Sequence, residues 1–159
     1  SLVHKSDYLR CYFMLHHGGG YSDVKAAFSS WLPVFNKLNA DPNKWCAGDS
    51  EKYPGGISDY ENKMTKDFKI YFNYSISVST FIFKPNSPFA KEWMAELKNR
   101  LDKFESTLIK YPGNIIGDNL GYPIFWSAIL SSIFAPLALK YHNNILHSSS
   151  LKSNNKNYR

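Results

Sequence analysis

The sequence has 159 residues, of which 43% are hydrophobic, 16% aromatic and 20% charged. This size and composition are typical of one folded domain and exclude a disordered or fibrous chain. The formal net charge of +6 favours anionic partners such as nucleotides, phosphorylated sugars or acidic lipids. The lysines and arginines are dispersed and no nucleic-acid-binding motif frames them, so nucleic acid is not an expected partner.

The cysteine content and the start of the chain bear on the cellular compartment. The sequence contains two cysteines, and Cys11 lies in an apolar run where a buried thiol is expected. Two cysteines are too few for a disulfide framework, which favours a reducing compartment. Residues 1–10 carry charge and a helical pattern instead of a secretory signal. We therefore expect a protein that is cytoplasmic or peripheral to a membrane and, since no initiating Met is present, residues missing upstream.

The first predicted element is a helix over residues 6–17. Ser6 is a suitable N-cap, and Asp7 would interact favourably with the positive end of the helix. The triple glycine at residues 18–20 ends the helix. Residues 21–24 are then expected to leave this turn as a short extended segment.

The middle of the chain predicts two strands separated by a loop. Residues 26–38 are expected to be a connecting segment, helical in its second half, and residues 45–47 a buried strand. Residues 49–67 are polar and contain a Pro-Gly-Gly turn signal, which predicts a loop. Residues 70–83 are rich in β-branched and aromatic side chains, which predicts a strand.

A long amphipathic helix is predicted to begin at Ser87, with Pro88 in its first helical position. Apolar residues then recur at helical spacing and are expected to face the core. These residues are Phe89, Trp93, Leu97, Leu101, Phe104 and Leu108.

A second C-terminal helix is predicted over residues 123–139. The same stretch contains no charged residue, so a membrane span is an alternative. Its serines and Pro136 favour a buried core helix instead, and Trp126 is expected to pack in that core. The polar residues that follow predict a domain over residues 1–147 and a disordered polar tail over residues 148–159.

Functional chemistry is concentrated near the start of the chain. Asp7 and Arg10 lie one helical turn apart, so they share a face of the helix. The triple glycine lets the backbone turn sharply and approach a ligand closely. Beyond it, Tyr21 offers a ring and Asp23 a carboxylate at the end of a short strand. A carboxylate in that place could hold a divalent cation that neutralises a diphosphate.

This arrangement resembles the glycosyltransferases with a DXD-type sugar-binding region, the group that includes capsular polysaccharide synthesis proteins and initiating mannosyltransferases. Their shared pattern is Ser-Asp-x-x-Arg on a helix, then Gly-Gly-x-Tyr, then Asp-x-Asp. The matching residues are Ser6, Asp7 and Arg10 for the first part, residues 18–21 for the second, and Asp23 for the first aspartate of the third. The resemblance continues through residues 73–93 and more loosely to His147.

The resemblance implies an α/β fold of the GT-A nucleotide-diphospho-sugar transferase type. This chain would hold only part of that fold, because the family's first strands normally precede the helix. The implied reaction transfers a hexose from a nucleotide-diphosphate sugar to a glycan or lipid-linked acceptor, with retention of configuration, in surface or capsular polysaccharide synthesis. The implied cofactor is a divalent cation, Mn²⁺ or Mg²⁺.

The resemblance also implies roles for individual residues. Asp7 and Arg10 would contact the sugar or ribose of the donor, and Tyr21 would line the nucleotide pocket. Asp23 would be catalytic and would hold the metal together with His147. The other predicted substrate-binding residues are Gly19, Gly20, Asn73 and Asp118.

Lys25 departs from the family pattern, because it occupies the place of the second motif aspartate. A lysine there could neutralise the diphosphate directly as a point charge, and Lys25 is therefore predicted to be catalytic together with Asp23. The departure leaves metal dependence open. It also motivates an alternative function, a non-catalytic module that binds a nucleotide sugar or a glycan without turnover.

Each motif also has a purely structural interpretation. Asp7 could serve only the helix N-terminus, with Arg10 as its surface partner, and the glycines could simply stop the helix. Asp23 could cap a turn. Residues 117–119 precede the second predicted helix, where their amides could bind phosphate or form an ordinary N-cap turn.

Overall fold

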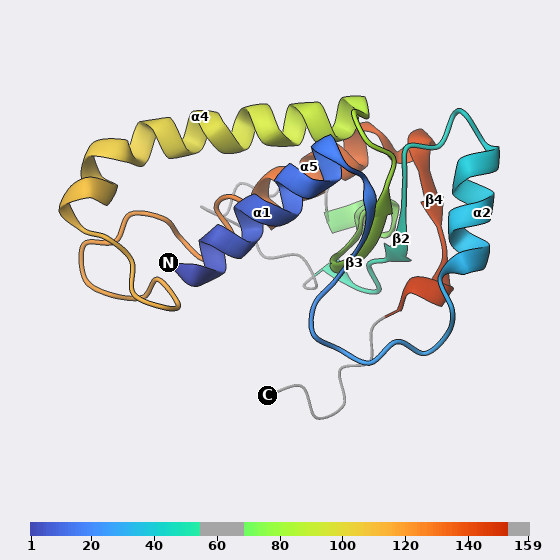
Figure 1. Ribbon diagram of the computed structural model, residues 1–159, viewed down its shortest axis with the longest axis horizontal. Coiled ribbons are helices and arrows are strands. Elements are labelled where there is room, and N and C mark those ends of the chain that lie inside the picture. Colours follow the sequence, from blue (N-terminus) through green and yellow to red (C-terminus); the bar gives the residue numbers. More distant parts are fainter. Residues whose placement is uncertain (55–68, 153–159) are drawn as a thin grey trace.

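The computed structural model describes residues 1–54 and 69–152, and its centre is a four-stranded mixed sheet (Figure 1). In sheet order the strands are β1 (Gly19–Ser22), β3 (Ile76–Phe83), β2 (Cys46–Ser50) and β4 (Ile145–His147). The strand β3 runs antiparallel to both of its neighbours, whereas β4 runs parallel to β2. The principal helices are α1 (Leu2–His16), α2 (Leu32–Ala40), α4 (Pro88–Lys110) and α5 (Ser131–Lys140).

Helices cover both faces of this sheet, so the fold is α/β, as predicted. The helices α1, α4 and α5 lie on one face and α2 on the other (Figure 1). Successive side chains of a strand point to opposite faces. Accordingly, Phe81 and Phe83 join the core beneath α1, α4 and α5, whereas Ile82 packs with residues of α2.

The larger core is dominated by aromatic side chains. Trp93 on α4 is 0% exposed, and its ring centroid lies 6.0 Å from that of Phe81 and 5.0 Å from that of Phe134. Edge-to-face packing at such distances adds to the stabilisation from burial. Ser87 caps α4, and the core-facing position of Trp93 confirms the stripe predicted for this helix.

Two elements, α1 and β3, begin at other residues than the sequence predicted. The N-cap of α1 is Ser1 instead of Ser6, because the Ser1 Oγ accepts a hydrogen bond from the amide of His4 at 3.2 Å. The strand β3 begins at Ile76, because a 3₁₀ turn, η2 (Phe72–Tyr74), precedes it. The strand predicted over residues 70–83 from their β-branched and aromatic content therefore forms only from Ile76 to Phe83.

The predicted second helix is shorter than expected, because its first part forms turns. The Ala128 carbonyl accepts hydrogen bonds from Arg100 Nη1 at 2.5 Å and from Ser132 Oγ at 3.0 Å, and the Ser132 amide bonds to Ser127 instead. The helix α5 therefore has 10 residues. Within residues 1–54 and 69–152, no helix is long and apolar enough to cross a membrane.

The C-terminal part of the described chain is ordered beyond the predicted domain end. Leu151 is 0% exposed, and its carbonyl accepts a hydrogen bond from Thr80 Oγ1 at 2.7 Å. Residues 148–152, predicted to begin a disordered tail, are thus fastened to β3. Residues 153–159 and most of the loop predicted over 49–67 lie outside the described residues.

Candidate functional site

The junction between α1 and β1 explains the triple glycine. Gly18 has a φ of 64°, and a Cβ there would lie 2.7 Å from the Phe83 carbonyl oxygen, so a side chain is excluded. A Cβ on Gly20 would lie 2.9 Å from the Trp31 ring. Gly19 and Gly20 belong to β1, and neither lines the pocket described below. Gly19 has a φ of 91°, which favours glycine, and Gly20 packs closely against Trp31. The substrate contact that the resemblance implies for these two residues stays a prediction.

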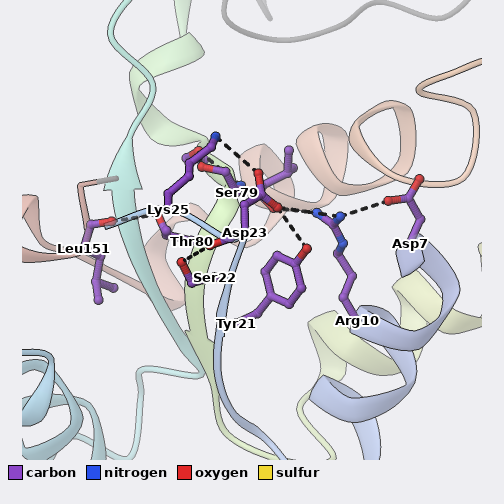
Figure 2. Close-up of polar contacts among 11 residues, drawn as sticks. Asp7, Arg10, Tyr21, Ser22, Asp23, Lys25, Ser79, Thr80 and Leu151 are labelled. Atoms are coloured by element: carbon purple, nitrogen blue, oxygen red, sulfur yellow. Dashed lines mark hydrogen bonds and ion pairs between the residues drawn. The ribbon is translucent and has the colours of Figure 1, made fainter. Parts of the chain in front are cut away.

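The predicted charged residues of α1 and of the segment that follows β1 come together in one cluster (Figure 2). Arg10 Nη2 lies 3.1 Å from Asp7 Oδ1 and 3.9 Å from Asp23 Oδ1. The Tyr21 hydroxyl donates a hydrogen bond to Asp23 Oδ1 at 2.9 Å, and Lys25 Nζ lies 3.3 Å from Asp23 Oδ2. The Asp23 carboxylate is therefore held by one hydroxyl and two cationic side chains.

Arg10 joins three elements of the fold. Its side chain is 9% exposed, and Nη1 donates a hydrogen bond to the Val78 carbonyl of β3 at 2.9 Å. Its guanidinium carbon lies 4.3 Å from the centroid of the Tyr21 ring, close enough for a cation–π interaction. Arg10 is thus a buried link between α1, β1 and β3 and not the surface partner of Asp7.

Burial shifts the acidity of two members of the cluster. Desolvation raises the pKa of Asp7 to about 6; the nearby Arg10 opposes this shift and Asp23 adds to it. Desolvation likewise raises the pKa of Tyr21 to about 12, so its hydroxyl keeps the proton that it donates to Asp23. Asp7 therefore changes its charge at about pH 6.

We expect the contribution of Asp7 to stability to decrease as the pH rises from about 4 to about 6. Asp7 binds its proton more tightly in the folded protein, with a pKa of about 6, than at its ordinary value of 3.8 in the unfolded chain. Deprotonation in this window therefore favours unfolding, by about 3 kcal/mol in total. The variant Asp7→Asn should lack this decrease, which urea unfolding of both proteins at several pH values would measure.

Comparing the pH dependence of stability of the wild type with that of Asp7→Asn isolates the contribution of Asp7. Burial also raises the pKa of Glu51, to about 7, and this gives a decrease of the same sign in both proteins. The Glu51 contribution cancels in the difference between them. Equal pH slopes for the wild type and the variant between pH 4 and 6 would show that Asp7 does not titrate as its burial requires.

Four members of the cluster, Asp7, Arg10, Tyr21 and Asp23, line a pocket of about 590 Å³, whereas Lys25 is absent from that lining. This volume lies within the range of about 300–1,000 Å³ found for small-ligand sites. The pocket has a polar side that includes Asp7, Arg10 and Asp23. Its apolar lining residues are Val3, Val24, Val78, Trp126 and Leu130.

Trp126 is a pocket residue and not a core residue as predicted. It is 58% exposed and lies in the turns that precede α5. The backbone around it is fixed, because His4 Nε2 donates a hydrogen bond to the Phe125 carbonyl at 3.2 Å and Ser127 is buried. The uncharged sequence around Trp126 is typical of a core helix, so sequence patterning contained no signal for this position.

Two predicted substrate-binding residues lie outside the pocket. Asn73 is exposed in η2 and does not line the pocket. Asp118 is exposed and accepts a hydrogen bond from Asn114 Nδ2 at 2.6 Å. Because the helix expected after residues 117–119 does not begin there, their amides are not at a helix N-terminus.

The residues present do not fit a divalent cation shared by Asp23 and His147. His147 lies on β4, three strand spacings or about 14 Å from the β1 edge, and its Nδ1 is 2.8 Å from Ser50 Oγ. A cation at Asp23 would also meet the positive groups of Arg10 and Lys25 beside the same carboxylate. Among the described residues, no cluster of three or more His, Cys, Asp or Glu could hold a metal ion.

No family model, curated protein or solved structure matches this chain. Its fold and its pocket together define a mixed α/β protein with a ligand-sized cavity beside α1 and the end of β1.

Proposed function

We propose that this pocket binds a nucleotide-diphosphate sugar and that the chain is the donor-binding and catalytic part of a hexosyltransferase. The observation that supports the proposal is the convergence of Asp7, Arg10 and Asp23 on one cavity. Carboxylates accept hydrogen bonds from sugar hydroxyls, and a guanidinium or an ammonium group attracts a diphosphate. The GT-A type of fold and retention of configuration belong to the same proposal.

The chemistry available to the pocket is stabilisation of the leaving group. When the bond between the anomeric carbon of the hexose and the diphosphate oxygen of the donor breaks, negative charge develops on the departing diphosphate. Lys25 and Arg10 are 10% and 9% exposed, and positive charges fixed in such an environment stabilise developing negative charge more strongly than they would in water. Arg10 lines the pocket, and Lys25 adjoins it through its ion pair with Asp23. Together they would provide the positive charge without a divalent cation. A glycan or lipid-linked acceptor would receive the hexose.

A non-catalytic binding module is the second candidate. The observation that favours it is the engagement of Asp23, whose two carboxylate oxygens contact Arg10, Tyr21 and Lys25. A carboxylate held in this way can bind a ligand hydroxyl but is poorly suited to act as a base or a nucleophile. Binding and turnover must therefore be measured separately.

We expect the donor to bind without added metal. Calorimetric titration with UDP-glucose, UDP-galactose and GDP-mannose, in EDTA and in Mn²⁺, should give affinities that agree within about twofold, because Lys25 and Arg10 already supply positive charge. A tenfold gain in Mn²⁺, about 1.4 kcal/mol, would contradict the metal-free site. Binding without hydrolysis or transfer would favour the module, and no binding of any of these compounds would contradict the proposed function.

A further inference from the structure

We propose that Trp126 is the platform on which the hexose ring of the donor rests. This inference depends on the proposed function, and it adds a recognition element that the sequence motifs do not contain. It assigns the polar side of the pocket to the hydroxyl groups of the ligand and the indole to a face of the sugar ring.

The first argument is the exposure of the indole in a cavity. Trp126 is 58% exposed, whereas Trp93 of the core is 0% exposed. An indole left in water does not gain the hydrophobic stabilisation that its burial would give. Because Trp126 lines the pocket together with Leu130, a ligand that enters would cover this apolar surface.

The second argument is the fixed position of the backbone that carries the indole. The Phe125 carbonyl accepts a hydrogen bond from His4 Nε2 at 3.2 Å. The Ala128 carbonyl accepts one from Arg100 Nη1 at 2.5 Å. The segment is therefore attached to α1 on one side of Trp126 and to α4 on the other. A fixed platform loses little conformational entropy when a ligand binds.

The third argument is the match between the two kinds of pocket lining and a hexose. A hexopyranose has C–H groups on the faces of its ring and hydroxyls around its edge. Asp7 and Asp23 can accept hydrogen bonds from hydroxyls, and Arg10 can donate them. A nucleobase would also stack on an indole, but it has no array of hydroxyls to match two carboxylates. The composition of the pocket therefore favours the sugar over the base.

The variant Trp126→Ala tests this assignment. We expect it to weaken the binding of UDP-glucose or GDP-mannose, whichever the wild type binds more tightly, by about three- to tenfold. The affinity for the corresponding UDP or GDP should change by less than about twofold. Trp126→Phe keeps an aromatic face and should retain most of the affinity. The matched control is Phe125→Ala, since Phe125 is 53% exposed, adjacent in sequence and absent from the pocket lining.

A second measurement covers the case in which Trp126→Ala fails to fold. The chain has four tryptophans, and the indole N–H signal of Trp126 in a ¹⁵N-labelled protein can be assigned by its absence in Trp126→Phe. In the wild type this signal should shift when the nucleotide sugar is added and should stay in place with the nucleotide alone.

Each other outcome overturns the assignment in a recognisable way. Equal losses for nucleotide sugar and nucleotide would place the base on Trp126. Unchanged affinities, or an indole signal that does not respond, would remove Trp126 from the site and leave the proposed function standing. A wild type that binds neither the nucleotide sugars nor the nucleotides would contradict both proposals.

Discussion

Replacing Asp23 by asparagine is expected to lower sugar transfer or donor hydrolysis by about 100-fold or more, because asparagine keeps the size of the side chain and removes its negative charge. The Asp23 carboxylate orients Lys25, Arg10 and the Tyr21 hydroxyl. Without its charge, Lys25 loses its ion pair with Asp23, whereas Arg10 keeps its contacts with Asp7 and the Val78 carbonyl. The positive charge beside the expected diphosphate is then less well oriented. The rates should be measured under saturating donor and compared with the affinity from calorimetry.

The fold should survive this substitution. The Asp23 side chain is 21% exposed, and partly exposed ion pairs contribute only modestly to stability. A matched control is Asp118→Asn, since Asp118 is exposed and bonds to Asn114 outside the pocket. This control should keep full activity. If Asp23→Asn were as active as the control, the catalytic site would have to lie elsewhere.

Replacing Arg10 by methionine is expected to lower the free energy of unfolding by about 3–5 kcal/mol. The substitution removes the hydrogen bond to the Val78 carbonyl and the ion pair with Asp7, whose side chain is 3% exposed. A buried carboxylate then has no neutralising partner, so the pKa of Asp7 should rise further above its ordinary value. Urea unfolding at neutral pH would measure the loss.

A double variant separates the charge effect from lost packing. Replacing both Arg10 and Asp7 by apolar residues should restore part of the stability, because removing a buried pair together costs less than removing one partner. The control is Glu96→Gln, which breaks the more exposed pair with Arg100 and should cost about 1 kcal/mol or less. A loss for Arg10→Met no larger than that of the control would contradict the role of Arg10 as a buried link.

Local sequence signals predicted the parts of the molecule that local interactions determine. Ser87 caps α4 as its position before a proline predicts, and Gly18 adopts the positive φ that ends α1. Asp7 and Arg10 share a face of α1 because of helical periodicity alone. Their approach to Asp23 followed from the short distance along the chain between the end of α1 at His16 and Asp23.

Long-range contacts determined the features that the sequence did not predict. The helix expected from residue 123 is shortened because Arg100 and Ser132 occupy the Ala128 carbonyl. Trp126 lies in the turns that replace this part of the helix and is exposed there. His147 lies far from Asp23 because β4 pairs with β2 at the other edge of the sheet, a partner choice that no local pattern encodes.

The pocket is lined by residues that lie far apart in the sequence, and this affects how it forms during folding. Val3 lies on α1, Val78 on β3 and Leu130 just ahead of α5, yet all three line the same cavity. Bringing them together requires the closure of long loops, which is slow compared with helix formation. During synthesis, a nascent chain that ended before Trp126 would carry Asp7 and Arg10 without the opposite wall. Recovery of ligand binding during refolding would therefore report the completion of tertiary assembly, at a later time than the helical circular dichroism signal.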